Sequence, residues 1–107
     1  MALNLAVSNI FAFNNISTTA QVVAQVNPAR GAILFHNPGT VDIVVGPSTV
    51  NVAGASANLA LTTGALGGGF RIYANGGTLT LTGNVAGAWQ ALSVSASGNP
   101  LTVMDLQ

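Results

Sequence analysis

Cysteine and lysine are both absent from this 107-residue chain, and few of its residues are charged or aromatic. Without cysteine, the chain can form neither a disulfide nor a thiolate metal site. Aromatic residues make up 6% of the sequence, and they form no cluster that would indicate a stacking platform. Charged residues make up 4%, against about 25% in an average soluble domain. The scarcity of charge is therefore the feature that most restricts the function.

The four charged side chains are Arg30, Asp42, Arg71 and Asp105, and their charges cancel. Nucleic acid binding is disfavoured, because contacts to phosphates need several lysines or arginines. A protein that works alone in solution generally carries a net charge, because neutrality favours association. We therefore expect a surface of small polar and apolar groups that suits permanent contact with other protein subunits.

The N-terminal segment is mildly apolar but has neither the composition of a signal peptide nor that of a membrane span. It lacks a basic start, and Asn4, Asn9 and Asn14 interrupt it. No apolar run in the chain reaches the roughly 18 residues that indicate a transmembrane helix. We therefore expect neither a signal peptide nor a membrane partner.

Apolar and polar residues alternate with period two in several short segments, which is typical of half-buried β-strands. In Thr78–Thr82, for example, Leu79 and Leu81 share one face and the threonines share the other. The segments predicted as strands are Gln21–Val26, Arg30–Asn37, Val41–Val45, Phe70–Ala74, Thr78–Thr82, Ala88–Ser95 and Leu101–Leu106. Val50–Val52 and Leu59–Leu61 are weaker candidates, and Leu3–Phe13 is either a strand or an arm that reaches a neighbour.

Glycine, proline and asparagine gather between these segments, as they do at turns. The sequence predicts tight hairpins at 37–40, 75–77 and 97–100, and a flexible Gly-rich connection at Gly64–Gly69. Eight or so short strands in about 100 residues favour an all-β, compact antiparallel two-sheet sandwich, with a jelly roll as one arrangement. We expect a single sandwich domain over residues 20–107, preceded by an N-terminal arm or first strand over residues 1–19.

Few residues could carry chemistry. His36, the only histidine, could contact Asp42 across a predicted hairpin, but a polar residue at a strand end explains it more simply. Asp105 lies close to the C-terminus, and no cluster has the spacing of metal ligands. Gly64–Gly69 lacks the lysine and the following helix of a phosphate-binding loop. We therefore expect no catalytic residues, no cofactor and no metal, and we do not expect an enzyme.

Four residues are candidates for contacts with other subunits. Arg30 and Arg71 each begin a predicted strand, and each either pairs with an aspartate of the same chain or reaches across a subunit boundary. Trp89 is either a core or an interface residue, because Trp often anchors interfaces. Tyr73, like Trp89, could alternatively stack on a sugar. The tentative interface set is thus Arg30, Arg71, Trp89 and Tyr73.

The middle of the chain resembles a pattern common in small virion proteins of tailed bacteriophages. The resemblance begins with Arg30–Gly46, in which Arg precedes an alternating apolar strand, an Asn-containing turn, a second apolar strand and a Gly. It continues through the Gly-rich stretch, the Phe70–Ala74 strand with its Tyr-Ala ending, and the closing strand at Leu101–Met104. The resemblance implies a structural role in the virion, such as a capsid decoration (cement) protein, which is often trimeric. It carries no catalytic residues.

These observations favour a bacteriophage capsid decoration protein that binds the major capsid protein lattice and stabilises the head. We expect it to be made in the host cytoplasm, to lie on the capsid surface, and to form a homo-oligomer, with a trimer favoured. The alternatives are a head-fibre or spike base, a tail component, or a glycan-binding recognition module of a fibre. The glycan-binding alternative requires an exposed aromatic platform, with Trp89 and Gln90 or Tyr73 and Asn75 as candidates.

Overall fold

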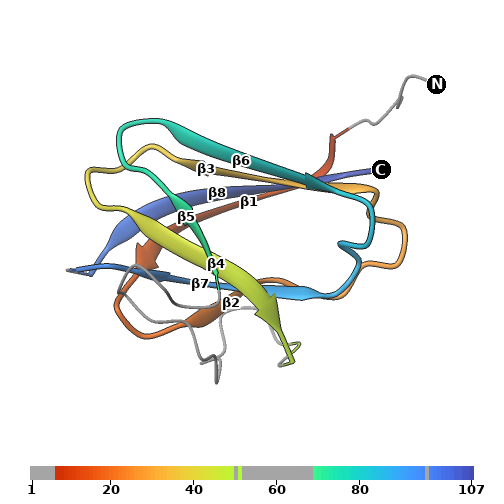
Figure 1. Cartoon of the computed structure of the whole chain (residues 1–107), viewed down its shortest axis with the longest axis horizontal. Helices are drawn as coiled ribbons and strands as arrows, with labels where there is room; N and C mark the ends of the chain where they lie inside the picture. The colour runs from red at the N-terminus through yellow and green to blue at the C-terminus, as the bar shows by residue number, and fades with distance from the viewer. Residues whose placement is uncertain (1–6, 50, 52–68, 96) are drawn as a thin grey trace.

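The computed structural model describes residues 7–49, 51, 69–95 and 97–107, and every element in these ranges is a β-strand (Figure 1). The strands are β1 (Val7–Ile16), β2 (Gln21–Ala24), β3 (Ala32–Asn37), β4 (Ile43–Ser48), β5 (Phe70–Ile72), β6 (Gly77–Thr82), β7 (Ala88–Ser93) and β8 (Asn99–Leu106). The weaker strand predictions at 50–52 and 59–61 lie outside the described residues, apart from Asn51. The predicted Gly-rich connection at 64–69 also lies outside them, apart from Gly69.

The strands form two four-stranded sheets that pack face to face (Figure 1). Sheet A has the order β1-β8-β3-β6, sheet B has the order β2-β7-β4-β5, and every pairing is antiparallel. Every connection between successive strands crosses from one sheet to the other except that between β4 and β5, and this strand order is the topology of a jelly roll. The predicted all-β sandwich is therefore confirmed, and the strand order identifies which sandwich it is.

The alternating sequence pattern explains which side chains of β6, in sheet A, face the core. Thr78, Thr80 and Thr82 of β6 are exposed, whereas Leu79 and Leu81 pack against the core. Of the two alternatives for the N-terminal segment, Val7–Ile16 forms a strand that pairs with β8 along the edge of sheet A. Residues 1–6 lie outside the described part of the chain.

Strand β4 extends further than its sequence suggests, through Gly46 and Pro47 to Ser48. Proline has no N–H for a sheet ladder, so it is tolerated only where one neighbour is missing. Among the described residues, the pairing of β4 with β5 covers 43–45, and at Pro47 the strand pairs with β7. Pro47 thus lies beyond the part of β4 that the described strands pair on both sides, where a proline need not end the strand.

Three turns that the sequence predicts as hairpins instead connect the two sheets. Residues 37–40 lead from β3 in sheet A to β4 in sheet B, and residues 75–77 and 97–100 also cross between sheets. The turn chemistry itself is present, since Asn75 and Gly76 have φ angles of 65° and 100°. The hairpin prediction is wrong because such residues specify a reversal of the chain and do not specify the sheet that receives the next strand.

The main core lies between the sheets and contains an aromatic pair. Phe35 of β3 is fully buried, and its ring meets the ring of Trp89 of β7 edge to face, with centroids 5.7 Å apart. The larger buried aliphatic residues that join this pair come from both sheets and from the β6–β7 connection, namely Ile16, Val23, Ile33, Ile43, Val45, Ile72, Val85, Leu101 and Val103. The aromatic pair thus connects sheet A to sheet B.

Candidate interaction surfaces

Arg30 is buried inside the chain, where it holds one end of the sandwich together. Its Nε donates to Asp105 Oδ1 over 2.7 Å, and the two side chains are 0% and 3% exposed. Its Nη1 donates to the carbonyls of Val85 and Gly87, and its Nη2 donates to the carbonyl of Gln25. Arg30 therefore links β8 to the β2–β3 and β6–β7 connections. Of the two alternatives for Arg30, the structure shows the pair within the chain.

Trp89, another residue of the tentative interface set, is also buried. Its ring packs against Phe35, and its Nε1 donates to the carbonyl of Val85 over 3.3 Å. Gln90, proposed beside it for a glycan platform, is buried as well, and its Nε2 donates to the carbonyl of Pro47. Neither side chain lies on the protomer surface, so these two residues do not form an exposed aromatic platform.

The other two residues of the set, Arg71 and Tyr73, lie side by side on the surface at the edge of sheet B. We call these two residues the β5 patch. Tyr73 is 66% exposed, and the Arg71 guanidinium lies 6.0 Å from the centroid of its ring. Phe70, which is 46% exposed, faces the opposite side of β5 and does not belong to the patch. Tyr and Arg are enriched at protein interfaces, so this patch has the composition of an interaction surface.

Asp42 fixes the Arg71 side chain of the β5 patch. Its Oδ2 accepts from Arg71 Nε over 2.9 Å, and its Oδ1 accepts from the N–H of Ala74 over 2.7 Å. The Ala74 N–H and the Arg71 guanidinium together hold the pKa of Asp42 below its ordinary value of 3.8. The Asp42 carboxylate therefore has Arg71 and Ala74 as its partners.

The lowered pKa of Asp42 predicts how stability responds to acid. Because the folded-state pKa is the lower one, the ionised carboxylate stabilises the fold above the unfolded-state pKa. This contribution disappears as the pH falls through the folded-state pKa. We expect wild type to lose more stability than Asp42→Asn when urea unfolding is compared between pH 7 and about pH 2. Parallel stability curves for the two proteins would contradict this assignment.

The outer face of sheet A is a second candidate surface, because it is broad and uncharged. The register aligns its side chains in rows across all four strands. One row contains Thr80, Leu34, Met104 and Ile10, and the next contains Thr78, His36, Thr102 and Ala12. All eight side chains are half-buried or exposed. The sheet thus presents a mixed threonine and aliphatic face to its surroundings.

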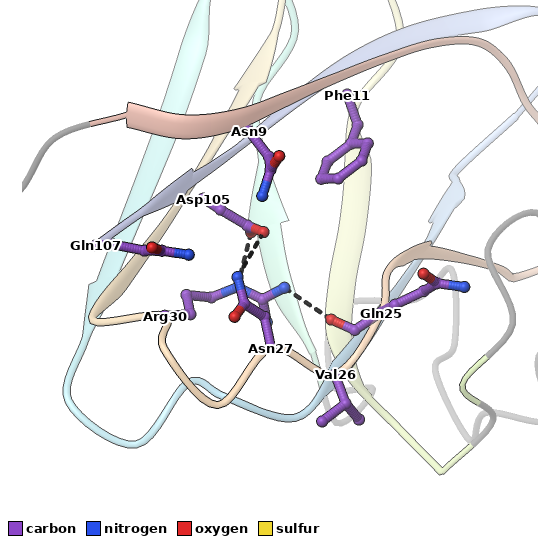
Figure 2. Close-up of a pocket in the computed structure, with 8 residues that line it drawn as sticks. All are labelled: Asn9, Phe11, Gln25, Val26, Asn27, Arg30, Asp105 and Gln107. Carbon is purple, nitrogen blue, oxygen red and sulfur yellow. Dashed lines mark hydrogen bonds and ion pairs between the residues drawn. The ribbon is translucent and has the colours of Figure 1, made fainter.

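A cavity of about 270 Å³ opens at the end of the sandwich that Arg30 holds together (Figure 2). It lies between β1, the β2–β3 connection and the end of β8. Its lining residues are Asn9, Phe11, Gln25, Val26, Asn27, Arg30, Asp105 and Gln107. Sequence reasoning did not single out this site. The one signal available was the pair of phenylalanines at positions 11 and 13, which an alternating strand directs to the same face.

Within the described ranges, His, Asp and Glu side chains do not gather in a group of three that could hold a metal ion. The same part of the chain contains no helix long and apolar enough to cross a membrane.

A scan of protein-family models and searches of curated proteins and of solved structures found no significant match to this chain. The function therefore has to be inferred from the chain's own fold and surface.

Proposed function

We propose that this chain is a structural protein of a tailed-bacteriophage virion, a capsid decoration protein that binds the major capsid protein lattice and stabilises the head. The observation that carries the proposal is a jelly roll with almost no charge on its surface. Jelly rolls recur in viral capsid proteins, although a fold alone does not determine function. The resemblance of residues 30–106 to small phage virion proteins also supports the proposal.

The distribution of the charged groups strengthens this proposal. Arg30 and Asp105 are buried against each other, so Arg71 and Asp42 form the only exposed ion pair among the four charged side chains. A surface with so little charge costs little to desolvate and gives no electrostatic steering. Such a surface suits a permanent contact with another neutral protein surface. The same scarcity of ionisable groups underlies our proposal that the chain is not an enzyme.

The available surface is sufficient for a lattice contact. A standard interface buries about 800 Å² on each partner, and the chain exposes 5523 Å² in total. Roughly one-seventh of the surface would therefore be used in a standard contact. The β5 patch supplies aromatic and arginine anchors, and the outer face of sheet A supplies uncharged area. Repetition over a capsid lattice adds avidity, and a homotrimer would add more.

A sedimentation experiment with capsids tests the proposal. Purified chain is mixed with empty capsids of the phage whose genome encodes it, and the capsids are pelleted. We expect wild type to pellet at a fixed ratio to the major capsid protein. Tyr73→Ala is expected to weaken binding by about tenfold, corresponding to a loss of roughly 1.4 kcal/mol at an interface anchor.

Thr18→Ala provides the matched control, because Thr18 is exposed on the β1–β2 connection and lies outside the β5 patch. This variant is expected to pellet like wild type. Wild-type chain that remains in the supernatant at every concentration would exclude the decoration role. Equal binding by wild type and Tyr73→Ala would exclude the β5 patch as the contact.

A further inference from the structure

The cavity beside β1 is preformed, because hydrogen bonds hold the chain after β2 away from sheet A. Strand β2 ends at Ala24, and the carbonyl of Gln25 then accepts from Arg30 Nη2 over 2.8 Å. The N–H of Val26 donates to Asn51 Oδ1 over 2.7 Å, and the N–H of Asn27 donates to the carbonyl of Ala86 over 2.8 Å. A ligand that enters this cavity would therefore pay little to order it.

The two charged groups at the floor of the cavity are already engaged with partners inside the chain. Arg30 donates from all three of its nitrogens to Asp105 and to backbone carbonyls. Asp105 accepts from Arg30 on Oδ1 and from Asn27 Nδ2 on Oδ2. Neither an anion nor a metal cation gains a free opposite charge here, so the lining favours a neutral ligand.

The walls of the cavity combine an aromatic ring with amide groups. Phe11 and Asn9 are two residues apart on β1 and point to the same side of the strand, toward the cavity (Figure 2). Phe11 is 40% exposed, although Phe13, on the same face, packs against the core. The exposed amide of Asn9 comes from the beginning of β1, and that of Gln107 comes from the residue that follows β8. The site thus offers one apolar surface together with donors and acceptors from separate directions.

A sugar ring has this combination of properties, because it carries an apolar C–H face and hydroxyl groups that radiate around its rim. An extended peptide differs, since it presents its amides in a single line along a strand edge. The volume is slightly below the roughly 300 Å³ at which pockets for drug-sized ligands begin, so it suits one ring. We propose that this cavity binds a neutral saccharide unit, which stacks on Phe11 and bonds to Asn9 and Gln107.

The cavity shares no residue with the β5 patch, and its test uses the chain without capsids. The saccharide proposal can therefore fail while the capsid proposal stands. The probes are the methyl glycosides of glucose, galactose, mannose and N-acetylglucosamine, titrated into the chain while NMR shifts are recorded. A parallel experiment uses immobilised oligosaccharides of the same sugars. Tighter binding to the oligosaccharides than to the methyl glycosides would indicate that the natural ligand is a polymeric glycan. We expect millimolar binding of at least one glycoside, with shifts centred on Phe11.

Phe11→Ala is expected to weaken that binding by about tenfold or more, and Asn9→Ala is expected to weaken it too. Ile10→Ala is the matched control, because Ile10 neighbours Phe11 on β1 and is 60% exposed on the opposite face. It should bind like wild type, and Trp89 fluorescence checks that all three variants fold. The proposal is overturned if no glycoside shifts Phe11, if Phe11→Ala binds normally, or if only capsid-protein peptides bind.

Discussion

Replacement of Arg30 by alanine is expected to lower the free energy of unfolding by about 3–5 kcal/mol, the usual cost of removing one partner of a buried ion pair. The Asp105 carboxylate would stay buried with only part of its hydrogen bonding. The carbonyls of Val85, Gly87 and Gln25 would each lose a donor as well. Such a loss would remove a large part of the stability of a domain this size, which is about 5–15 kcal/mol.

Urea unfolding followed by Trp89 fluorescence measures this effect. Arg71→Ala is the matched control, because it removes the same side chain from an exposed ion pair, and such pairs contribute under about 1 kcal/mol. A double variant, Arg30→Met with Asp105→Leu, should recover only part of the loss, since the carbonyls of Val85, Gly87 and Gln25 still lose the hydrogen bonds that Arg30 donates. If Arg30→Ala were no more harmful than Arg71→Ala, Arg30 would not hold the sandwich together as described.

Truncation of Phe35 to alanine is expected to cost about 3–5 kcal/mol, because it leaves a cavity in the core and removes the edge-to-face contact with Trp89. Phe35 belongs to sheet A and Trp89 to sheet B, so the substitution removes a contact between the two sheets. Phe70→Ala is the control, since the same atoms are removed from a ring that is half exposed at the edge of sheet B.

Denaturant midpoints for the two phenylalanine variants give the comparison. We expect Phe70→Ala to remain within about 1 kcal/mol of wild type, as surface substitutions usually do. Similar losses of stability at positions 35 and 70 would show that the Phe35–Trp89 contact does not stabilise the core as described.

The sequence predicted the strands well because alternation is a local property. The pattern at Thr78–Thr82 correctly placed Leu79 and Leu81 toward the core. The sheet to which each strand belongs, by contrast, is not determined by the local sequence. The turns at 37–40 and 75–77 have the composition of hairpins, yet each leads to the opposite sheet. Strand order depends on which faces are buried together, and turn residues do not encode that.

The surfaces could be predicted only in part. Because the chain has only four charged side chains, the sequence limited Arg30 and Arg71 to two alternatives each, an aspartate of the same chain or a contact with another subunit. The structure shows an aspartate partner within the chain for both. Burial, however, separates them, because Arg30 lies inside and Arg71 lies at the surface. The cavity beside Phe11 could not be foreseen, since it depends on where β2 ends and on the hydrogen bonds of Arg30.

The virion role is tested most directly by the mass of the purified chain in solution, measured by light scattering with and without empty capsids. The account predicts a stable small oligomer, with a trimer favoured, that leaves the free fraction and joins the capsid fraction at a fixed ratio. A monomer whose mass and amount are unchanged by capsids would contradict it.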